Sequence, residues 1–314
     1  PAPGLQVVGH EMVGSVVAKG DNVTNVNVGD VVGVGCMVGA KCLDKTTGKL
    51  TCNSCVNNKD ERFCEKGQIG TYGSVEIMAD GTEQATMGGY STDIVVDANF
   101  AVEIPEFFQQ PENQRFGPPI MCAGTTLYTA LVHGGCGPQK RVGINGIGGL
   151  GYFGISIALA MGAEVYAFTR SESKKADLLA LGVKDVIITT DEEQVKAYAN
   201  KLDLIVDTVS AVHNIDQMLS LLAPFGKLGC VGAPPTMSFM PFSMIIKQLS
   251  VYGSIIGSIQ HSREVLELCA KHKICIPVEM INPKDIEASY GRMLKSDVKY
   301  RFAIDMDSMR NDTQ

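Results

Sequence analysis

Four cysteines crowd into one short stretch of this chain and could hold a metal ion. Their spacing is Cys42-x9-Cys52-x2-Cys55-x8-Cys64, which places four thiols within twenty-three residues. Four thiolates form a closed, tetrahedral structural zinc site, and the Cys-x-x-Cys pair is the most specific part of this pattern. The long first spacer is tolerable because loop-closure entropy rises only logarithmically with length. We expect structural zinc here, the alternative being free buried thiols, and we expect the nearby Cys36 in the core.

A glycine-rich turn in the middle of the chain could bind the phosphates of a dinucleotide. Its residues are Gly146-Ile147-Gly148-Gly149-Leu150-Gly151, in the pattern G-x-G-x-x-G. An apolar run at Val142 to Asn145 precedes it, a helical pattern at Tyr152 to Ala160 follows, and a second apolar run occupies Val165 to Phe168. The glycines permit a tight turn and bring the backbone close to a pyrophosphate, whose charge then lies at a helix N-terminus. This context predicts dinucleotide binding, the alternative being a turn that only packs helix on strand.

The residues after the second apolar run favour NADP over NAD. An NAD site would have an Asp or Glu at this strand end for the adenosine ribose, whereas this chain has Thr169-Arg170-Ser171, followed by Lys174 and Lys175. Arg170 and Lys174 could bind a 2′-phosphate through charge-assisted hydrogen bonds, and the hydroxyls of Thr169 and Ser171 could donate as well. A solvated basic loop is the alternative interpretation.

A second group of candidate metal ligands is less specific. His10 precedes Glu11, and a lone histidine beside a glutamate is usually a hydrogen-bonded structural pair. Cys122 falls at the junction before the dinucleotide region, where a ligand would face a nicotinamide. On spacing alone, a shared site for His10 and Cys122 is a hypothesis.

The elements that must position these residues differ between the two parts of the chain. Residues 1 to about 100 are rich in Val and Gly, with β-branched runs at Val31 to Val34 and Ile94 to Val96, and predict a β-rich region. From Lys140, apolar runs alternate with amphipathic stretches in the rhythm of a doubly wound parallel sheet. These runs are Val142 to Asn145, Val165 to Phe168, Val186 to Ile188, Leu204 to Val206 and Leu228 to Val231. The polar, Pro-bearing segment Phe107 to Pro119 is expected to be a surface connection or linker.

Composition and charge narrow the classes of protein. A length of 314 residues predicts two domains, and 45% hydrophobic with 19% charged residues excludes the disordered class. A net charge of -7 argues against nucleic acid or an anionic membrane surface as partner. No run of eighteen apolar residues occurs, so no ordinary transmembrane helix is expected. Since nothing marks the chain for secretion, we expect it in the cytoplasm.

Taken together, the motifs resemble those of the zinc-dependent medium-chain alcohol dehydrogenases, and among them the NADP-dependent cinnamyl alcohol dehydrogenase group. The resemblance covers essentially the whole chain. The matching segments are Gly9-His10-Glu11, Val28 to Cys36, the four-cysteine loop, Gly88-Gly89-Tyr90-Ser91, Met121 to Thr126, Gly146 to Gly151, Asp207-Thr208-Val209 and Ser296 to Phe302. As a set they are far more specific than any single motif.

The resemblance implies a fold of the α/β plus β class. A GroES-like, β-rich catalytic domain would be joined to a Rossmann domain with a doubly wound parallel sheet. We expect the catalytic domain at residues 1–122, with its zinc lobe at 36–70, the NADP-binding domain at 123–257, and the C-terminal part of the catalytic domain at 258–314. The family also implies a homodimer, formed through the strand near Val251.

The resemblance also implies which residues surround the reacting atoms. His10 and Cys122 would be ligands of a catalytic zinc in the cleft, with Glu11 as an adjacent carboxylate that can approach the metal. Thr126 would contact the nicotinamide end of the cofactor, and Ser254 would lie near the cofactor. The implied reaction transfers hydride between NADP(H) and a primary alcohol or aldehyde, with zinc polarising the carbonyl oxygen and a hydroxyl relay supplying the proton.

Two departures from the family pattern affect these expectations. The spacers of the four-cysteine loop are longer than usual, so the shape of the lobe is expected to differ while its ligands stay the same. The family also has a stretch before the Gly-His-Glu motif, with a first cysteine ligand and the Ser or Thr of the relay, and this chain starts after it. With only His10, Cys122 and at best Glu11, we expect a weak catalytic zinc site. We interpret the chain as an N-terminally truncated form of an active enzyme, the alternative being a natural product without catalysis.

Two other functions stay open at this point. One is a reductase of the same superfamily that uses no catalytic metal, which zinc stoichiometry would distinguish. The other is a protein that binds NADPH without turnover, which binding without aldehyde-dependent oxidation would indicate.

Overall fold

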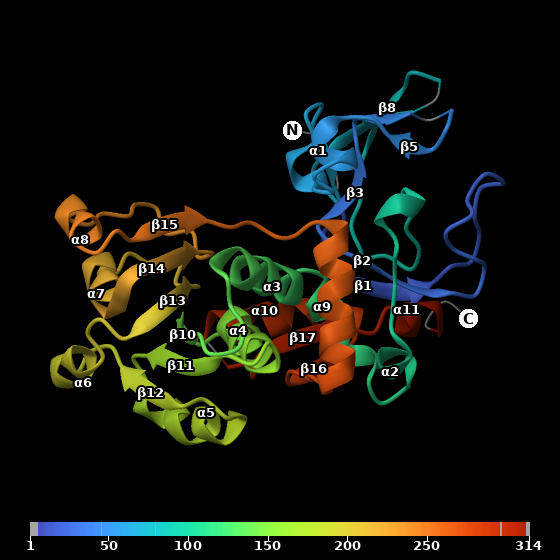
Figure 1. The fold of residues 1–314 in the computed structure, drawn as a ribbon. Coiled ribbons are helices and arrows are strands. Elements are labelled where there is room, and N and C mark those ends of the chain that lie inside the picture. The colour runs from blue at the N-terminus through green and yellow to red at the C-terminus, as the bar shows by residue number, and fades with distance from the viewer. Residues whose placement is uncertain (1–5, 45, 79, 296, 312–314) are drawn as a thin grey trace. The chain divides into compact units, whose positions relative to one another are not determined.

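The structure, a computed structural model, divides into two compact units (Figure 1). It describes residues 6–44, 46–78, 80–295 and 297–311, so the segment Pro1–Leu5 and Ser296 of the last matching motif lie outside the described residues. The first unit comprises Pro1–Thr125 with Gly257–Gln314, and the second comprises Thr126–Ile256. The helix α3 (Ala123–Gly134) begins in the first unit and continues into the second.

The first unit is built from short strands in several small sheets. Its three-stranded sheet has the order β1-β2-β9, with β1 (Met12–Ser15), β2 (Val31–Val34) and β9 (Val102–Glu103) antiparallel. Two-stranded sheets pair β3 (Met37–Ala40) with β6 (Gln68–Gly70), β4 (Leu43–Asp44) with β5 (Lys49–Leu50), β7 (Val75–Ile77) with β8 (Glu83–Ala85), and β16 (Val278–Ile281) with β17 (Arg301–Ile304). The prediction of a β-rich first part is confirmed, and β2 has the predicted bounds.

The helices of the first unit are short apart from α9. They are α1 (Asn53–Val56), α2 (Glu106–Gln109), α9 (Ile259–His272), α10 (Ile286–Leu294) and α11 (Asp307–Asn311), with 3₁₀ helices η1 (Glu61–Phe63), η2 (Ala98–Phe100), η3 (Gln114–Phe116), η4 (Pro118–Met121) and η6 (Pro283–Asp285). Ser258 caps α9, because its hydroxyl accepts a hydrogen bond from the backbone N–H of His261 at 3.2 Å. The apolar face of α9, including Val265 and Leu266, is buried.

One sequence-based prediction in this unit is wrong and another holds only in part. Residues 94–96 form no strand, and Val95 is 97% exposed, so β-branched side chains alone did not give this run a partner strand. The segment 107–119, predicted as a surface connection or linker, exposes residues 110–112 as expected, but it also folds into short helical turns, namely most of α2, η3 and the start of η4, and buries Phe108 and Pro119. Because most residues of this segment are polar, the sequence pattern did not indicate that Phe108 and Pro119 would be buried.

The second unit contains one six-stranded parallel sheet with the order β12-β11-β10-β13-β14-β15. Its strands are β10 (Arg141–Asn145), β11 (Glu164–Thr169), β12 (Asp185–Ile188), β13 (Leu202–Asp207), β14 (Leu222–Cys230) and β15 (Ser250–Gly253). Its helices are α4 (Gly149–Ala160), α5 (Lys175–Leu181), α6 (Glu192–Ala197), α7 (Ile215–Leu221) and α8 (Pro241–Ile245), with η5 (Glu172–Lys174). The predicted doubly wound sheet is confirmed, and its strand order reverses at β10, where such sheets bind ligands.

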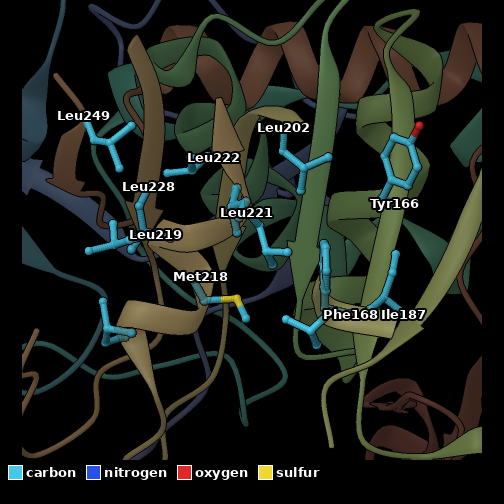
Figure 2. Packing of buried hydrophobic residues seen from close by; sticks show 13 residues of the cluster. Tyr166, Phe168, Ile187, Leu202, Met218, Leu219, Leu221, Leu222, Leu228 and Leu249 are labelled. Carbon is cyan, nitrogen blue, oxygen red and sulfur yellow. The ribbon is translucent and has the colours of Figure 1, made fainter. Parts of the chain in front are cut away.

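A core of buried side chains holds this sheet together (Figure 2). Phe168 on β11, Ile205 on β13 and Leu228 on β14 are almost completely buried, and Met218 and Leu219 bring α7 into the same cluster. Parallel strands covered on both faces are continuous apolar runs, which explains why the sequence signal was clear here. Among the residues that the structure describes, no helix has the length and apolar character that crossing a bilayer requires.

Candidate metal and cofactor sites

The four predicted thiols of the first unit come together. Cys42, Cys52, Cys55 and Cys64 are all buried, and their sulfur atoms all lie within 4.8 Å of one another. The Sγ atoms of Cys52 and Cys64 are 3.9 Å apart. Sulfur ligands of a tetrahedral zinc ion are separated by about 3.8 Å when each Zn–S bond is about 2.3 Å. The cluster therefore fits a structural zinc site.

A small hairpin explains how the long spacer is accommodated. Strands β4 and β5 pair within it, with Leu43 opposite Leu50. The residues that flank the hairpin, Cys42 and Thr51, are therefore close together. The Thr51 hydroxyl donates to the carbonyl of Cys42 at 2.6 Å and fastens the two ends together. At the hairpin tip, the backbone N–H of Thr46 donates to the Asp44 carboxylate at 2.8 Å. The inserted residues thus form their own structure and leave the ligand arrangement intact.

Hydrogen bonds around Cys52 lower the pKa of its thiol. Burial raises the pKa of this thiol, but hydrogen bonds from the backbone N–H groups of Cys55 and Glu65, together with those from the Cys55 and Cys42 thiols, outweigh burial and lower the pKa to about 6. Cys52 is also the N-cap residue of α1. A thiolate is the form that ligates zinc, so this position favours metal binding.

The second group of metal-ligating side chains in the first unit contains His10, Cys36 and Cys122. One potential ligand atom from each lies within 4.8 Å of the others, and all three residues are half-buried. The hypothesis that His10 and Cys122 come together therefore agrees with the structure. The expectation for Cys36 is wrong, because Cys36 does not pack in the core but joins this group.

Hydrogen bonding and charge distinguish the two cysteines of this group. A hydrogen bond from the Cys36 thiol is the largest influence on Cys122, whose pKa falls to about 5 although burial opposes the shift. The same hydrogen bond, together with burial, raises the pKa of Cys36. A hydrogen bond with Cys122 likewise raises the pKa of His10 against the opposing effect of burial.

Glu11 lies beside this group but is not one of its three members. Burial raises the pKa of Glu11 to about 7, and the positive charge of Arg301 opposes that rise. A guanidinium nitrogen of Arg301 lies 3.9 Å from the Glu11 carboxylate. Glu11 as a metal ligand stays a prediction, and the structure places its carboxylate beside Arg301. Sequence reasoning had given Arg301 no role, although it lies in the matching segment at the C-terminal end.

In the second unit, the glycine-rich turn has the geometry that phosphate binding requires. It follows β10 directly, Gly146 has a positive φ of 85°, and Gly148 is the N-cap of α4. A Cβ atom on Gly151 would lie 2.0 Å from the carbonyl oxygen of Gly146, so a side chain there would push helix and turn apart. A Cβ on Gly148 would meet nothing within 4 Å, which leaves the backbone there open to a ligand. Ile147, Gly149 and Leu150 complete the turn and the first residues of α4.

The candidate 2′-phosphate residues follow β11 in the same unit. Arg170 is exposed, and the hydroxyls of Ser171 and Ser173 are 2.7 Å apart. Thr169 is buried, and its hydroxyl accepts a hydrogen bond from the backbone N–H of Ser171 at 3.2 Å, so it shapes the loop. Lys174 donates to the carbonyl of Ile147 at 2.7 Å. This bond ties the basic loop to the glycine-rich turn.

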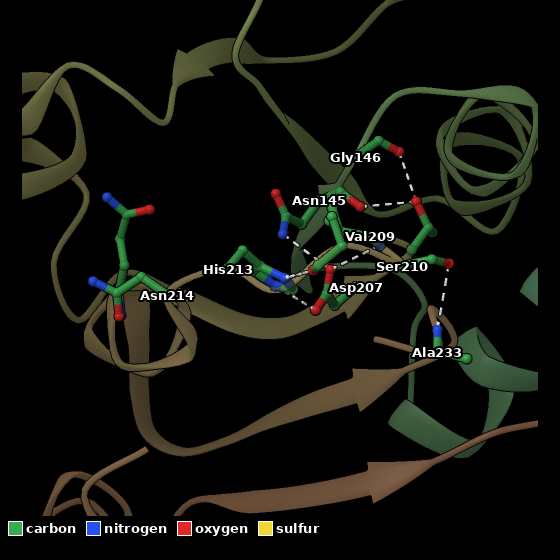
Figure 3. A network of polar contacts seen from close by, with 11 residues as sticks. Asn145, Gly146, Asp207, Val209, Ser210, His213, Asn214 and Ala233 are labelled. Carbon is green, nitrogen blue, oxygen red and sulfur yellow. Dashed lines mark hydrogen bonds and ion pairs between the residues drawn. The ribbon is translucent and has the colours of Figure 1, made fainter. Parts of the chain in front are cut away.

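A network of polar contacts from the end of β13 fixes the position of the glycine-rich turn (Figure 3). The Thr208 hydroxyl bridges the carbonyls of Asn145 and Gly146 at 2.9 and 2.7 Å. The Asn145 amide donates to the buried Asp207 carboxylate at 3.0 Å, and Nε2 of His213 lies 2.8 Å from the other Asp207 oxygen. Sequence reasoning noted the Asp207 segment only as a family match, because nothing in the spacing links it to residue 145.

Two further predicted cofactor residues also lie in this unit. Thr126 is buried on α3. Ser254 follows β15, and its buried hydroxyl has no hydrogen-bond partner among the described residues. An orphaned buried hydroxyl is the kind of group that a ligand satisfies.

Comparisons with known proteins agree with both units. A family model described as an alcohol dehydrogenase GroES-like domain matches residues 1–106, and one described as a zinc-binding dehydrogenase matches residues 149–271. The aldehyde reductase YahK of Escherichia coli is 41% identical over 304 residues, which are 95% of this chain and 82% of YahK.

Solved structures give the same result. A cinnamyl alcohol dehydrogenase of Sorghum bicolor, SbCAD4, superposes with a TM-score of 0.86 at 34% identity, over 96% of this chain and 82% of that one. A cinnamyl alcohol dehydrogenase of Helicobacter pylori, solved with NADP(H), superposes with a TM-score of 0.82, also at 34% identity and with the same coverage. This chain is therefore a member of the zinc-binding alcohol dehydrogenase family, with a GroES-like domain and a Rossmann domain.

Proposed function

We propose that this protein is an NADP-dependent, zinc-dependent alcohol dehydrogenase that interconverts a primary alcohol and an aldehyde. The observation that carries the proposal is the meeting of His10 and Cys122, far apart in the sequence, in one group of metal ligands. The names of the relatives support it, since they describe an aldehyde reductase and cinnamyl alcohol dehydrogenases, one with NADP(H). Their substrates indicate the class to test first.

The residues present fit both a zinc ion and a dinucleotide. An imidazole and a thiol are preferred zinc ligands, and the Cys122 thiol ionises readily in its surroundings. For the dinucleotide, the open position at Gly148 and the orphaned Ser254 hydroxyl offer an approach and a hydrogen bond. When bound, zinc polarises a carbonyl or alcohol oxygen, and NADP(H) exchanges a hydride with the carbon atom.

The side chains of the chain itself bind and orient these groups. We assign the pyrophosphate to the N-terminus of α4, where backbone N–H groups are free to donate. Thr208 and Lys174 hold the turn in shape from opposite sides. Glu11 and Arg301 keep a carboxylate and a guanidinium next to the metal ligands, where they balance the charge of the site.

Turnover with a panel of aldehydes tests the proposal. Purified protein with two zinc ions per chain should oxidise NADPH when a primary aldehyde is present. Turnover that persists with only the four-cysteine zinc loaded would instead support a reductase without catalytic metal. NADPH binding with no oxidation by any aldehyde would support a binding protein.

The preference for NADPH should depend on Arg170. Its guanidinium is exposed at the end of β11, with no acidic residue at that position, and a charge-assisted hydrogen bond to a phosphate is worth about 1.5–3 kcal/mol. We expect Arg170→Ala to raise the Kd of NADPH by about 10- to 100-fold and to leave the Kd of NADH unchanged.

Lys175→Ala is the matched control, because it removes the same charge five residues away, at the start of α5, from a residue that pairs only loosely with Glu172, at 3.9 Å. Fluorescence titration with both cofactors gives the Kd values. Equal weakening of NADPH and NADH by Arg170→Ala would mean that the residue only shapes the loop, and the NADP assignment would fall.

We also propose that the protein is a homodimer. Strand β15 lies at the edge of its sheet, and the neighbouring α8 region exposes Phe242, Ile245 and Ile246 by 66–69% each. An unpaired strand edge next to an apolar patch favours pairing with a second copy. Light scattering should give the dimer mass for the native chain and the monomer mass for Ile245→Glu. Leu294→Glu, at an exposed position on α10, should stay dimeric.

A cytoplasmic location is the interpretation that the cysteines favour. All ten are free thiols in the structure, and six of them belong to the two groups of potential metal ligands described above. Thiols arranged for metal binding are typical of reducing compartments.

A further inference from the structure

His213 lies in the loop between β13 and α7, and no motif in the sequence singled it out. Its side chain is 19% exposed, and Nε2 lies 2.8 Å from a carboxylate oxygen of Asp207 (Figure 3). We propose that His213 is a positioning residue of the cofactor site, which holds Asp207, and through Asp207 the turn at Gly146, in the geometry that receives the pyrophosphate of NADP(H). This inference rests on the proposed function and adds to it a residue that acts through the turn.

The buried Asp207 carboxylate is the group that His213 pairs with. One carboxylate oxygen accepts a hydrogen bond from the Asn145 amide at 3.0 Å and a second from the backbone N–H of Val209 at 3.1 Å, and the other oxygen faces His213. A buried carboxylate destabilises a fold unless its charge is paired and its oxygens are hydrogen-bonded. Among the residues that the structure describes, no lysine or arginine forms an ion pair with Asp207. The balance of its charge therefore depends on His213.

Both nitrogens of the His213 ring face oxygen atoms that act only as acceptors. Nδ1 lies 2.9 Å from the carbonyl oxygen of Ala211, and Nε2 lies against Asp207. A neutral imidazole carries one N–H and the imidazolium carries two, so only the protonated ring satisfies both oxygens. The next residue, Asn214, is the N-cap of α7, and its side chain accepts a hydrogen bond from the backbone N–H of Gln217 at 3.1 Å. The ring is thus oriented by two contacts of its own and by the start of a helix.

The segment that begins at Asp207 packs directly against the glycine-rich turn. Besides the bridge made by the Thr208 hydroxyl, the backbone N–H of Thr208 donates to the carbonyl of Asn145 at 2.9 Å. A Cβ atom on Gly146 would lie 2.7 Å from a methyl carbon of Val209, so no space separates this segment from the turn. A shift of the Asp207 side chain would therefore move Asn145 and the start of the turn with it.

The backbone of the same segment is anchored independently of His213. The carbonyl of Asp207 accepts hydrogen bonds from the backbone N–H groups of Val231 and Gly232 at 2.9 and 3.0 Å. A Cβ atom on Gly232 would lie 2.4 Å from the carbonyl oxygen of Val209, which shows how closely the two loops pack. Loss of the His213 ring should therefore free the Asp207 carboxylate while the sheet stays folded, so that cofactor affinity changes more than stability does.

Cofactor titrations of the full chain test the proposal without measuring turnover. His213→Ala should raise the Kd of NADPH and of NADH by the same factor, about tenfold or more, because the pyrophosphate is common to both cofactors. This equal effect differs from the selective effect expected for Arg170→Ala. His213→Gln, whose amide can still donate to Asp207, should recover part of the affinity. His133→Ala is the matched control, because it removes an exposed histidine of the same unit, on α3, and should leave both Kd values native.

A double-mutant cycle tests whether His213 acts through Asp207. Asp207→Asn removes the charge and keeps an acceptor oxygen for Asn145, so in this background His213→Ala should weaken NADPH binding by less than about threefold. Circular dichroism should show that each variant is folded, and His213→Gln carries the same comparison if His213→Ala does not fold.

Three results would overturn the positioning role of His213 and leave the proposed function intact. They are native Kd values in a folded His213 variant, a loss confined to NADPH, and a full tenfold effect of His213→Ala in the Asp207→Asn background. Binding of neither cofactor by the native chain would instead overturn the proposed function together with this inference.

Discussion

Replacing Gly151 with alanine is expected to abolish NADPH binding at micromolar concentrations. The added Cβ would lie 2.0 Å from the carbonyl oxygen of Gly146, and no backbone atom can yield to it without moving α4 away from the turn. A displacement of about 1 Å in a site of this kind weakens function about 100-fold. Overpacking of the same contact should lower the free energy of unfolding by about 1–3 kcal/mol. Fluorescence titration and thermal unfolding measure the two effects.

Two glycine variants separate the cofactor effect from the packing effect. Gly137→Ala introduces a Cβ that meets nothing within 4 Å, in the loop before β10, and should change neither measurement. Gly148→Ala is equally free of clashes in the protein, so its unfolding should stay native. Its NADPH affinity should nevertheless fall at least tenfold, because a methyl group would block the approach to the N-terminus of α4. Native affinity in Gly148→Ala would remove the pyrophosphate from this position.

The sheet of the second unit could be predicted from the sequence because strands that are buried on both faces appear as short, continuous runs of apolar residues. Four of the five predicted runs lie inside strands that are largely buried, and the fifth, Leu228 to Val231, covers the end of β14 and one residue beyond it. The glycine-rich turn could also be predicted, because its pattern has to be matched only with the strand before it and the helix after it. Local patterns of this kind carry their own structural context.

The group of His10, Cys36 and Cys122 could be predicted only in part, because its members come from segments far apart in the chain. His10 and Cys122 were found through the family resemblance, but Cys36 was expected in the core. The register of β1 and β2 decides its true neighbour, and a register cannot be derived from a four-residue strand alone. Gly33 and Gly35 are the signal that could have found it, since two glycines next to a cysteine indicate close backbone approach.

The long spacer of the four-cysteine loop shows the opposite case. Sequence reasoning left the shape of the lobe open because the distance from Cys42 to Cys52 departs from the family. The residues within the spacer determine its shape. Asp44, Thr46 and Gly48 form the tip of a hairpin, and Gly48 has a positive φ of 66°. Turn chemistry of this kind is readable from sequence, and it keeps the two ends of the insertion together.

Loss of the four-cysteine zinc is expected to destabilise the first unit strongly. Cys52→Ser should lower the zinc content by one ion per chain and reduce the free energy of unfolding by more than about 3 kcal/mol, because a structural zinc contributes directly to folding. The midpoint of thermal unfolding should fall by about 10 °C. Cys136→Ser is the control, because burial raises the pKa of that thiol to about 11 and it belongs to no metal group. A Cys52→Ser protein with native zinc content would show that the thiols are not ligands.

We expect Cys52→Ser also to destabilise the start of helix α9, which lies nearly 200 residues from the zinc lobe in the sequence. Glu61, on η1 between Cys55 and Cys64 of the four-cysteine cluster, is buried, and its carboxylate accepts a hydrogen bond from the backbone N–H of Ile259 at 3.1 Å. Because this N–H is one of the free donors at the start of α9, it depends on Glu61 once the lobe has folded. Hydrogen exchange at the first turn of α9 should therefore accelerate in Cys52→Ser.

Variants of Glu61 test this coupling with the zinc in place. Glu61→Ala should keep both zinc ions but leave a buried N–H unpaired, which costs about 1–3 kcal/mol and should speed exchange at Ile259. Glu61→Gln keeps an acceptor oxygen at the same place and should behave almost like the native chain. If exchange at Ile259 is native in Glu61→Ala, the lobe does not hold α9 through this bond. In that case the loss of stability in Cys52→Ser must arise within the lobe alone.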